Sequence, residues 1–130
     1  MFWGELRLSK ELRLFGIFLC LTNLLSALHW GSLDHFARQS LSDPLALCWP
    51  FFENCSASRA WMLTHLSAFL IAFASLSILA ALAFAGAQTR LAWLSATLAL
   101  VLKLLLIAQD YRFSGNFHYM SQWTWVAFLF

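Results

Sequence analysis

The sequence predicts an all-α, polytopic membrane protein, a four-transmembrane-helix bundle with one long extracytoplasmic loop, in one domain over residues 1–130. Hydrophobic residues make up 62% of the 130 residues and charged residues 11%, and the mean hydropathy is +0.72. A water-soluble domain has roughly half apolar and roughly a quarter charged residues. This composition therefore excludes a soluble enzyme, a nucleic-acid-binding protein and a disordered regulator.

Four apolar segments give the expected helices. A transmembrane helix needs about 20 apolar residues, and the expected helices cover about residues 14–30, 60–86, 91–109 and 117–130. The residues before the first helix mix cations with apolar side chains, which predicts an interfacial turn that leads into the membrane. No small-x-small cleavage site follows this segment, so we interpret it as a retained first helix rather than a signal peptide.

The connection at residues 31–58 is the expected extracytoplasmic loop, and its Asp43-Pro44 and Trp49-Pro50 pairs break helices. Lys and Arg are densest in the N-terminal segment, and Arg90 adds a cation in the short turn after the second helix. Because cytoplasmic segments are enriched in Lys and Arg, we place the N-terminus in the cytoplasm. The membrane that we expect for this chain is a bacterial inner membrane.

The fourth apolar segment is short. Fourteen helical residues span about 21 Å, whereas the hydrocarbon core is about 30 Å thick. Its sequence ends Trp-Val-Ala-Phe-Leu-Phe without a flanking charge. We therefore expect either that partner helices cover this end or that the natural chain continues beyond Phe130.

A polar layer is expected inside the outer half of the membrane. Counting from the outer end of each expected helix at about 1.5 Å per residue, one polar residue per helix lies about 10 Å deep: Asn23, His65, Lys103 and Gln122. Lys103 and Asp110 are seven residues apart and share a helix face. Such residues normally face the interior of a bundle, so Lys103, His65 and Asp110 are the catalytic candidates. Polar contacts that only hold the helices together are the alternative.

Cysteine and histidine supply two further candidate sites. Cys48 and Cys55 lie on the oxidising side, which favours a structural disulfide over a redox-active pair. Cys20 is expected to be a small packing residue. Four histidines fall on the extracytoplasmic side and are candidate ligands for a metal or haem, although histidine also favours the membrane interface: His29, His35, His65 and His118.

Small residues repeat every four positions in the second and third expected helices. Such rows allow close helix packing in membranes, and they are Ala68 and Ala72; Ser77, Ala81 and Ala85; and Ala92 and Ala96.

The run from Asp110 to Met120, Asp-Tyr-Arg-Phe-Ser-Gly-Asn-Phe-His-Tyr-Met, resembles a segment of bacterial HTTM-type membrane proteins, which are related to vitamin K-dependent carboxylases. The resemblance covers this run and the multi-helix arrangement, and it implies a shortened or partial member of that family. Four helices with an extracytoplasmic cysteine pair also resemble quinone-coupled disulfide-forming enzymes, whose Cys-x-x-Cys motif is absent here.

These features predict a subunit or accessory factor of a larger membrane complex, surrounded by lipid and other membrane subunits, with a polar pocket near the extracytoplasmic face. Two enzymatic alternatives stay open: an HTTM-like enzyme acting on a lipophilic substrate, and a quinone-linked thiol oxidoreductase using Cys48 and Cys55. As a cofactor we favour a bound lipid or quinone over a metal or haem.

Overall fold

The computed structural model describes residues 9–32, 55–109 and 116–129. Within these ranges every regular element is a helix, which confirms the all-α class, and the helices are α1 Lys10–Ser32, α3 Cys55–Thr64, α4 Leu66–Ala85, α5 Thr89–Gln109 and α6 Asn116–Leu129. Three segments in this part of the chain are long and apolar enough to cross a membrane, by length and composition: Lys10–Gly31, Leu66–Ala85 and Thr89–Ala108.

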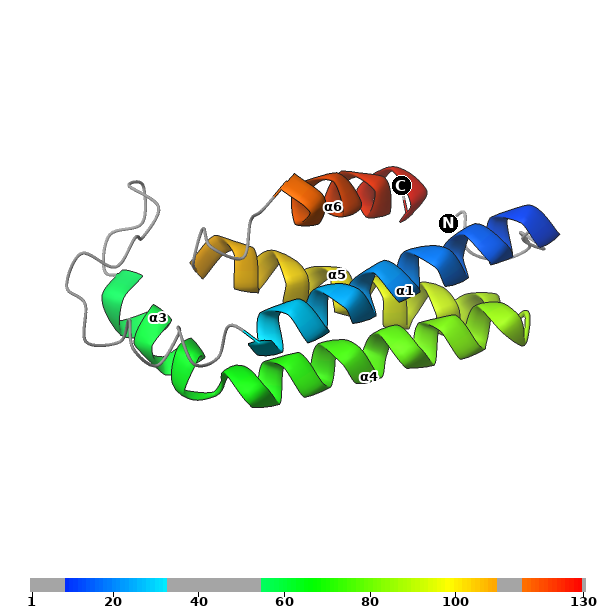
Figure 1. The fold of residues 1–130 in the computed structure, drawn as a ribbon. Helices are drawn as coiled ribbons and strands as arrows, with labels where there is room; N and C mark the ends of the chain where they lie inside the picture. The colour runs from blue at the N-terminus through cyan, green and yellow to red at the C-terminus, as the bar shows by residue number, and fades with distance from the viewer. Residues whose placement is uncertain (1–8, 33–54, 110–115, 130) are drawn as a thin grey trace.

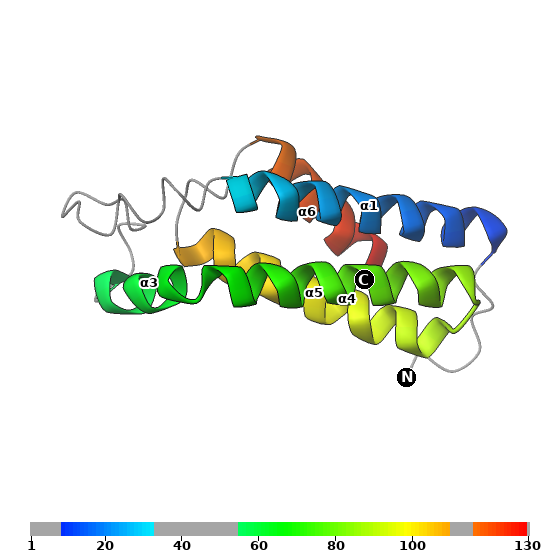
Figure 2. The same ribbon diagram turned by 60° about the horizontal axis from the view of Figure 1, so that its bottom comes forward.

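The four longest helices form an antiparallel bundle (Figure 1). α1 and α5 run in one direction, and α4 and α6 run in the other. α4 packs against both α1 and α5, and α6 packs against the same two helices. Figure 2 shows that α6 runs diagonally to the axis of α1. The centre of the bundle is therefore enclosed by α1, α4, α5 and α6.

Helix α1 begins four residues before the expected start at residue 14. Ser9 acts as its N-cap, because its Oγ accepts a hydrogen bond from the Leu12 amide at 3.3 Å. Glu11 in the first turn adds a negative charge at the positive end of the helix dipole. The last four residues of the lead-in that we expected to be an interfacial turn, residues 10–13, therefore form the first turn of α1, while residues 1–8 lie outside the described residues.

The second expected helix, residues 60–86, is divided into α3 and α4 at His65. The Nδ1 of His65 lies 2.8 Å from the carbonyl oxygen of Trp61, and the His65 amide is shared between the carbonyls of Trp61 and Met62. The side chain thus competes for a backbone acceptor that a regular helix would use, and α3 bends away from α4 (Figure 1). Since α3 starts at Cys55, the expected loop at residues 31–58 ends earlier than predicted.

Small side chains allow the bundle helices to approach closely. Buried alanines line the inner faces of α4 and α5, and they are Ala80, Ala83, Ala92, Ala96 and Ala99. On α1, a Cβ atom added at Gly16 would lie 3.0 Å from the Phe84 ring of α4. Because lipid removes the hydrophobic drive between helices, dispersion contacts of this kind hold a membrane bundle together.

The last turns of α6 are held by an aromatic cluster around Phe128. Its ring stacks on Trp93 of α5 at a centroid distance of 5.3 Å and meets Phe84 of α4 edge-on at 5.8 Å. Phe15 of α1 lies 5.6 Å away, and Trp125 of α6 is 6.0 Å away. Four aromatic rings of this chain therefore contact Phe128 near the end of α6, while Phe130, where we expected either partner helices or a longer natural chain, lies outside the described residues.

The turn between α4 and α5 is a Schellman motif. The amide of Gln88 donates to the carbonyl of Ala83 at 2.9 Å, and the amide of Ala87 donates to that of Phe84 at 3.3 Å. Ala87 has a φ of 58°, the left-handed conformation in which this motif usually places glycine. The turn therefore closes with a strained, left-handed backbone at Ala87.

Arg13 completes the end of α4. Its Nε donates to the carbonyl of Phe84 at 2.8 Å, and its Nη2 donates to the carbonyl of Ala85. These carbonyls belong to the last turn of α4, beyond the reach of helical amides, and that of Phe84 accepts from Arg13 as well as from the Ala87 amide. A cation at this negative end of the helix dipole is favourable as well, so Arg13 fixes the height of α1 beside α4.

Replacing Ala87 with glycine should stabilise the protein by about 0.5–1 kcal/mol, because glycine removes the left-handed strain at a moderate entropic cost. Unfolding by SDS in mixed micelles measures the difference. Ala85→Gly is the matched control: Ala85 lies inside the last helical turn, so the same change there should destabilise by a similar amount. Effects of the same sign for both variants would contradict this account of the turn.

Candidate functional site: a polar level between two apolar cores

A level of polar side chains separates two buried apolar clusters. The cluster toward the α4–α5 turn includes Cys20, Ala80 and Leu100, whereas the cluster toward α3 includes Trp30, Phe73 and Leu106. Buried polar residues lie between these two sets on three helices, and they are Thr22, Asn23 and Ser26 on α1, Ser77 on α4 and Lys103 on α5. The bundle thus carries a buried polar level through its interior.

Lys103 is the central group of this level, and its side chain is 0% exposed. Its ammonium group donates to the Oγ of Ser121 on α6, and it donates to the Oδ1 of Asn23 on α1 at 3.4 Å. One side chain of α5 therefore joins three of the four bundle helices.

Helical spacing explains why Lys103 points inward. The buried residues of α5 recur every three or four positions, and they are Ala92, Ser95, Ala96, Ala99, Leu100, Lys103 and Leu106. On α1 the buried stripe is Leu19, Cys20, Thr22, Asn23, Ser26 and Trp30. Each stripe is a single helix face, and both faces carry one strongly polar group at the level where they meet.

Neutral oxygens solvate the Lys103 amine. The one acidic residue in the described part of the chain is Glu11, which is exposed in the first turn of α1, far from Lys103. An intramembrane lysine is costly unless its donors are paired, and an ammonium has three donors. On burial the Lys103 ammonium group loses its water, and Asn23 and Ser121 replace part of that hydration. The contribution of these two acceptors to stability therefore increases with the charge that they solvate.

The expected polar layer is brought together only in part. Asn23 and Lys103 meet, as described above. His65 is exposed at the α3–α4 junction, with its ring 4.8 Å from that of Trp61, so it does not join Lys103. The side chain of Gln122 and the whole of Asp110 lie outside the described residues.

Ser121 is the member of the site that sequence reasoning missed. Depth alone did not separate it from its neighbour Gln122. Helix phase would have distinguished Ser121 from Gln122. Ser121, Trp125 and Phe128 are spaced i, i+4 and i+7, so they share the helix face that packs into the bundle.

The candidate metal ligands and the cysteine pair are described only in part. His29 is exposed in the last turn of α1, His35 lies outside the described residues, and only the backbone of His118 is described. Among the described side chains, no three His, Cys, Asp or Glu groups could hold a metal ion.

The three cysteines also lie partly inside and partly outside the described residues. Cys48 lies outside the described residues, and only the backbone of Cys55 is described, so the expected disulfide stays a prediction. Cys20 is a free thiol with an exposed fraction of 0%. It packs with Leu19 and Trp125 in the cluster near the α4–α5 turn, in the place expected for a small packing residue.

No protein-family model, curated protein or solved structure matches the chain. The resemblance to HTTM-type proteins therefore stays a prediction, and the site has to be interpreted from its own geometry. What that geometry provides is a buried cation that links α1, α5 and α6 through neutral acceptors.

Replacing Asn23 with leucine should cost about 2–3 kcal/mol, because it leaves the enclosed Lys103 amine short of an acceptor. The double variant Asn23→Leu with Lys103→Met should recover most of this loss, since it removes the donor and the acceptor together. SDS unfolding of the wild type, both single variants and the double variant measures the coupling free energy, which we expect to be about 2 kcal/mol.

Ser77→Ala serves as the control in this cycle. The Ser77 hydroxyl donates to the carbonyl of Phe73 in its own helix at 2.8 Å, so its effect should add to that of Lys103→Met without coupling. Additive effects of the Asn23 and Lys103 changes, or equal coupling of Ser77 with Lys103, would contradict a specific Asn23–Lys103 interaction.

Proposed function

We propose that this chain is an integral protein of a bacterial inner membrane, with four spans and a cytoplasmic N-terminus, and that it serves as a subunit or accessory factor of a larger membrane complex. In this role the polar level holds the bundle together, and the outer helix faces contact lipid and a partner subunit.

Apolar side chains on the outside of the bundle support a lipid environment. Leu28 on α1 is 73% exposed, Ile71 on α4 is 66% exposed, and Leu94 on α5 is 61% exposed. A soluble monomer rarely leaves such large apolar areas open to water. Lipid tails cover them without cost.

The packing of α6 supports a fourth span. This helix contacts α1 and α5 along the bundle (Figures 1 and 2), and its inner face carries Ser121 to the level of Lys103. A helix that solvates an intramembrane lysine from one side lies at the depth of that lysine.

The observation that carries the partner proposal is the outer face of α4. Ala68, Ala72 and Ser75 are exposed on one side of α4, opposite the buried side that carries Leu70, Phe73 and Ser77. Small residues at such spacing allow a second membrane helix to approach closely. The buried alanines of α4 and α5 are used within the bundle, whereas this exposed row is free to receive a helix from outside.

Ala72→Ile should release the chain from its complex, because the added side-chain atoms would hold a partner helix away from α4. Membranes solubilised in a mild detergent and separated by blue native electrophoresis should show the wild type at an apparent mass above that of the monomer. The variant should run as the monomer.

Ala127→Ile is the matched control, since Ala127 is exposed on α6 and receives the same substitution. It should leave the complex intact. A monomeric wild type, or an Ala72→Ile variant that still runs in the complex, would overturn the subunit proposal.

Thiol labelling tests the proposed orientation and the proposed disulfide separately. In spheroplasts, a membrane-impermeant maleimide should label Cys48 and Cys55 only after a reductant is added. Labelling that requires permeabilised membranes would overturn the orientation, and labelling without reductant would overturn the disulfide. Cys20 provides an internal control because its buried side chain should not react; a Cys48→Ser, Cys55→Ser variant should therefore show no label.

A further inference from the structure

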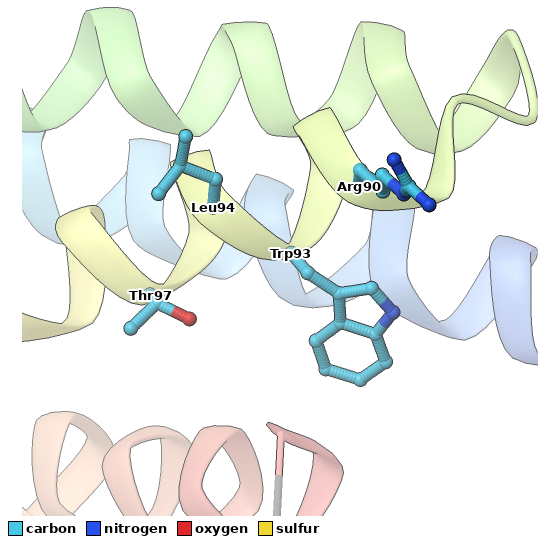
Figure 3. Close-up of a pocket in the computed structure, with 4 residues that line it drawn as sticks. All are labelled: Arg90, Trp93, Leu94 and Thr97. Carbon is cyan, nitrogen blue, oxygen red and sulfur yellow. The ribbon is translucent and has the colours of Figure 1, made fainter. Parts of the chain in front are cut away.

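A groove runs along one face of α5, beside α6. It has a volume of about 310 Å³ and is lined by Arg90, Trp93, Leu94 and Thr97. Figure 3 shows Trp93 and Thr97 directed from α5 toward α6, with Arg90 at the end next to the α4–α5 turn. The groove lies at the opposite end of α5 from Lys103, so it is separate from the polar level.

The groove changes in polarity along its length. Arg90 is exposed in the first turn of α5, while the indole of Trp93 and the side chain of Leu94 make the next part apolar. Arg90 and Thr97 are seven positions apart, which corresponds to about 10 Å along the helix axis. A ligand that fits this groove has an anionic end and an apolar body.

Positive charge gathers at the Arg90 end of the bundle. Lys10 is exposed in the first turn of α1, which lies at the same end as the α4–α5 turn (Figure 1). Arg13 is occupied by the α4 carbonyls, whereas Arg90 has no ion pair with any described residue. An arginine fork suits a phosphate group, and the positive end of the α5 dipole adds to the attraction.

We propose that this groove binds one anionic phospholipid from the leaflet at the Arg90 end of the bundle. Its phosphate lies on the Arg90 guanidinium, and the upper part of one acyl chain follows Trp93 and Leu94 to Thr97. The volume lies at the lower end of the range for small-molecule pockets, roughly 300–1,000 Å³, which accommodates this part of a lipid and leaves the rest in the bilayer. The proposal does not depend on a partner helix at α4.

Native mass spectrometry of the purified full chain in detergent tests the site, with phosphatidylglycerol and phosphatidylcholine of matched acyl chains as probes. The wild type should retain one phosphatidylglycerol in preference to phosphatidylcholine. Arg90→Gln should lower phosphatidylglycerol retention about tenfold, because the phosphate loses a bidentate partner. Arg90→Lys should keep part of the binding.

Three controls keep the result specific. Lys10→Gln removes a cation at the same end but outside the groove, and it should change retention less than twofold. Thr97→Trp should fill the groove and displace either lipid, while inorganic phosphate should not compete. Circular dichroism confirms that the Arg90 variants fold. Unchanged retention in Arg90→Gln, an equal loss in Lys10→Gln, or displacement by inorganic phosphate would overturn the proposal.

Discussion

The amine of Lys103 is the group on which the rest of the bundle depends. A lysine within an apolar helix must find acceptors before it is buried, and here they come from Asn23 on α1 and Ser121 on α6. This requirement sets the heights of both helices relative to α5. It also divides the interior, because apolar side chains fill the space above and below the polar level.

A second polar constraint acts at the other end of α1. Arg13 pairs with the last carbonyls of α4, ten residues before Asn23, or about 15 Å along the helix. With α1 fixed at these two points, a shift of one helical turn would break both sets of hydrogen bonds at once. Dispersion contacts such as that between Gly16 and Phe84 stabilise the close approach, but apolar packing in lipid is less specific about register than paired donors.

Sequence reasoning predicts part of this arrangement. Hydropathy gives the three long membrane helices, and counting depth from their ends brings Asn23 and Lys103 to one level. Depth carries no information about helix phase, which is why Ser121 was missed beside Gln122. Nor does composition reveal that His65 takes the carbonyl of Trp61 and interrupts a long apolar run. Arg13 is one of the cations before residue 14 that were expected to form an interfacial turn, and its pairing with the α4 carbonyls depends on tertiary contacts that no local pattern contains.

The enclosure of Lys103 limits the access of other molecules to its amine. A substrate that used its amine would first have to separate α6 from α1 and α5, and so break the contacts of Ser121 and Phe128. In this arrangement the Lys103 amine joins α1, α5 and α6. The two surfaces proposed above for other molecules lie on the outside of the bundle, namely the small-residue face of α4 and the groove of α5. These lie on different helices, so a partner subunit on α4 and a lipid beside Arg90 would not compete for the same surface.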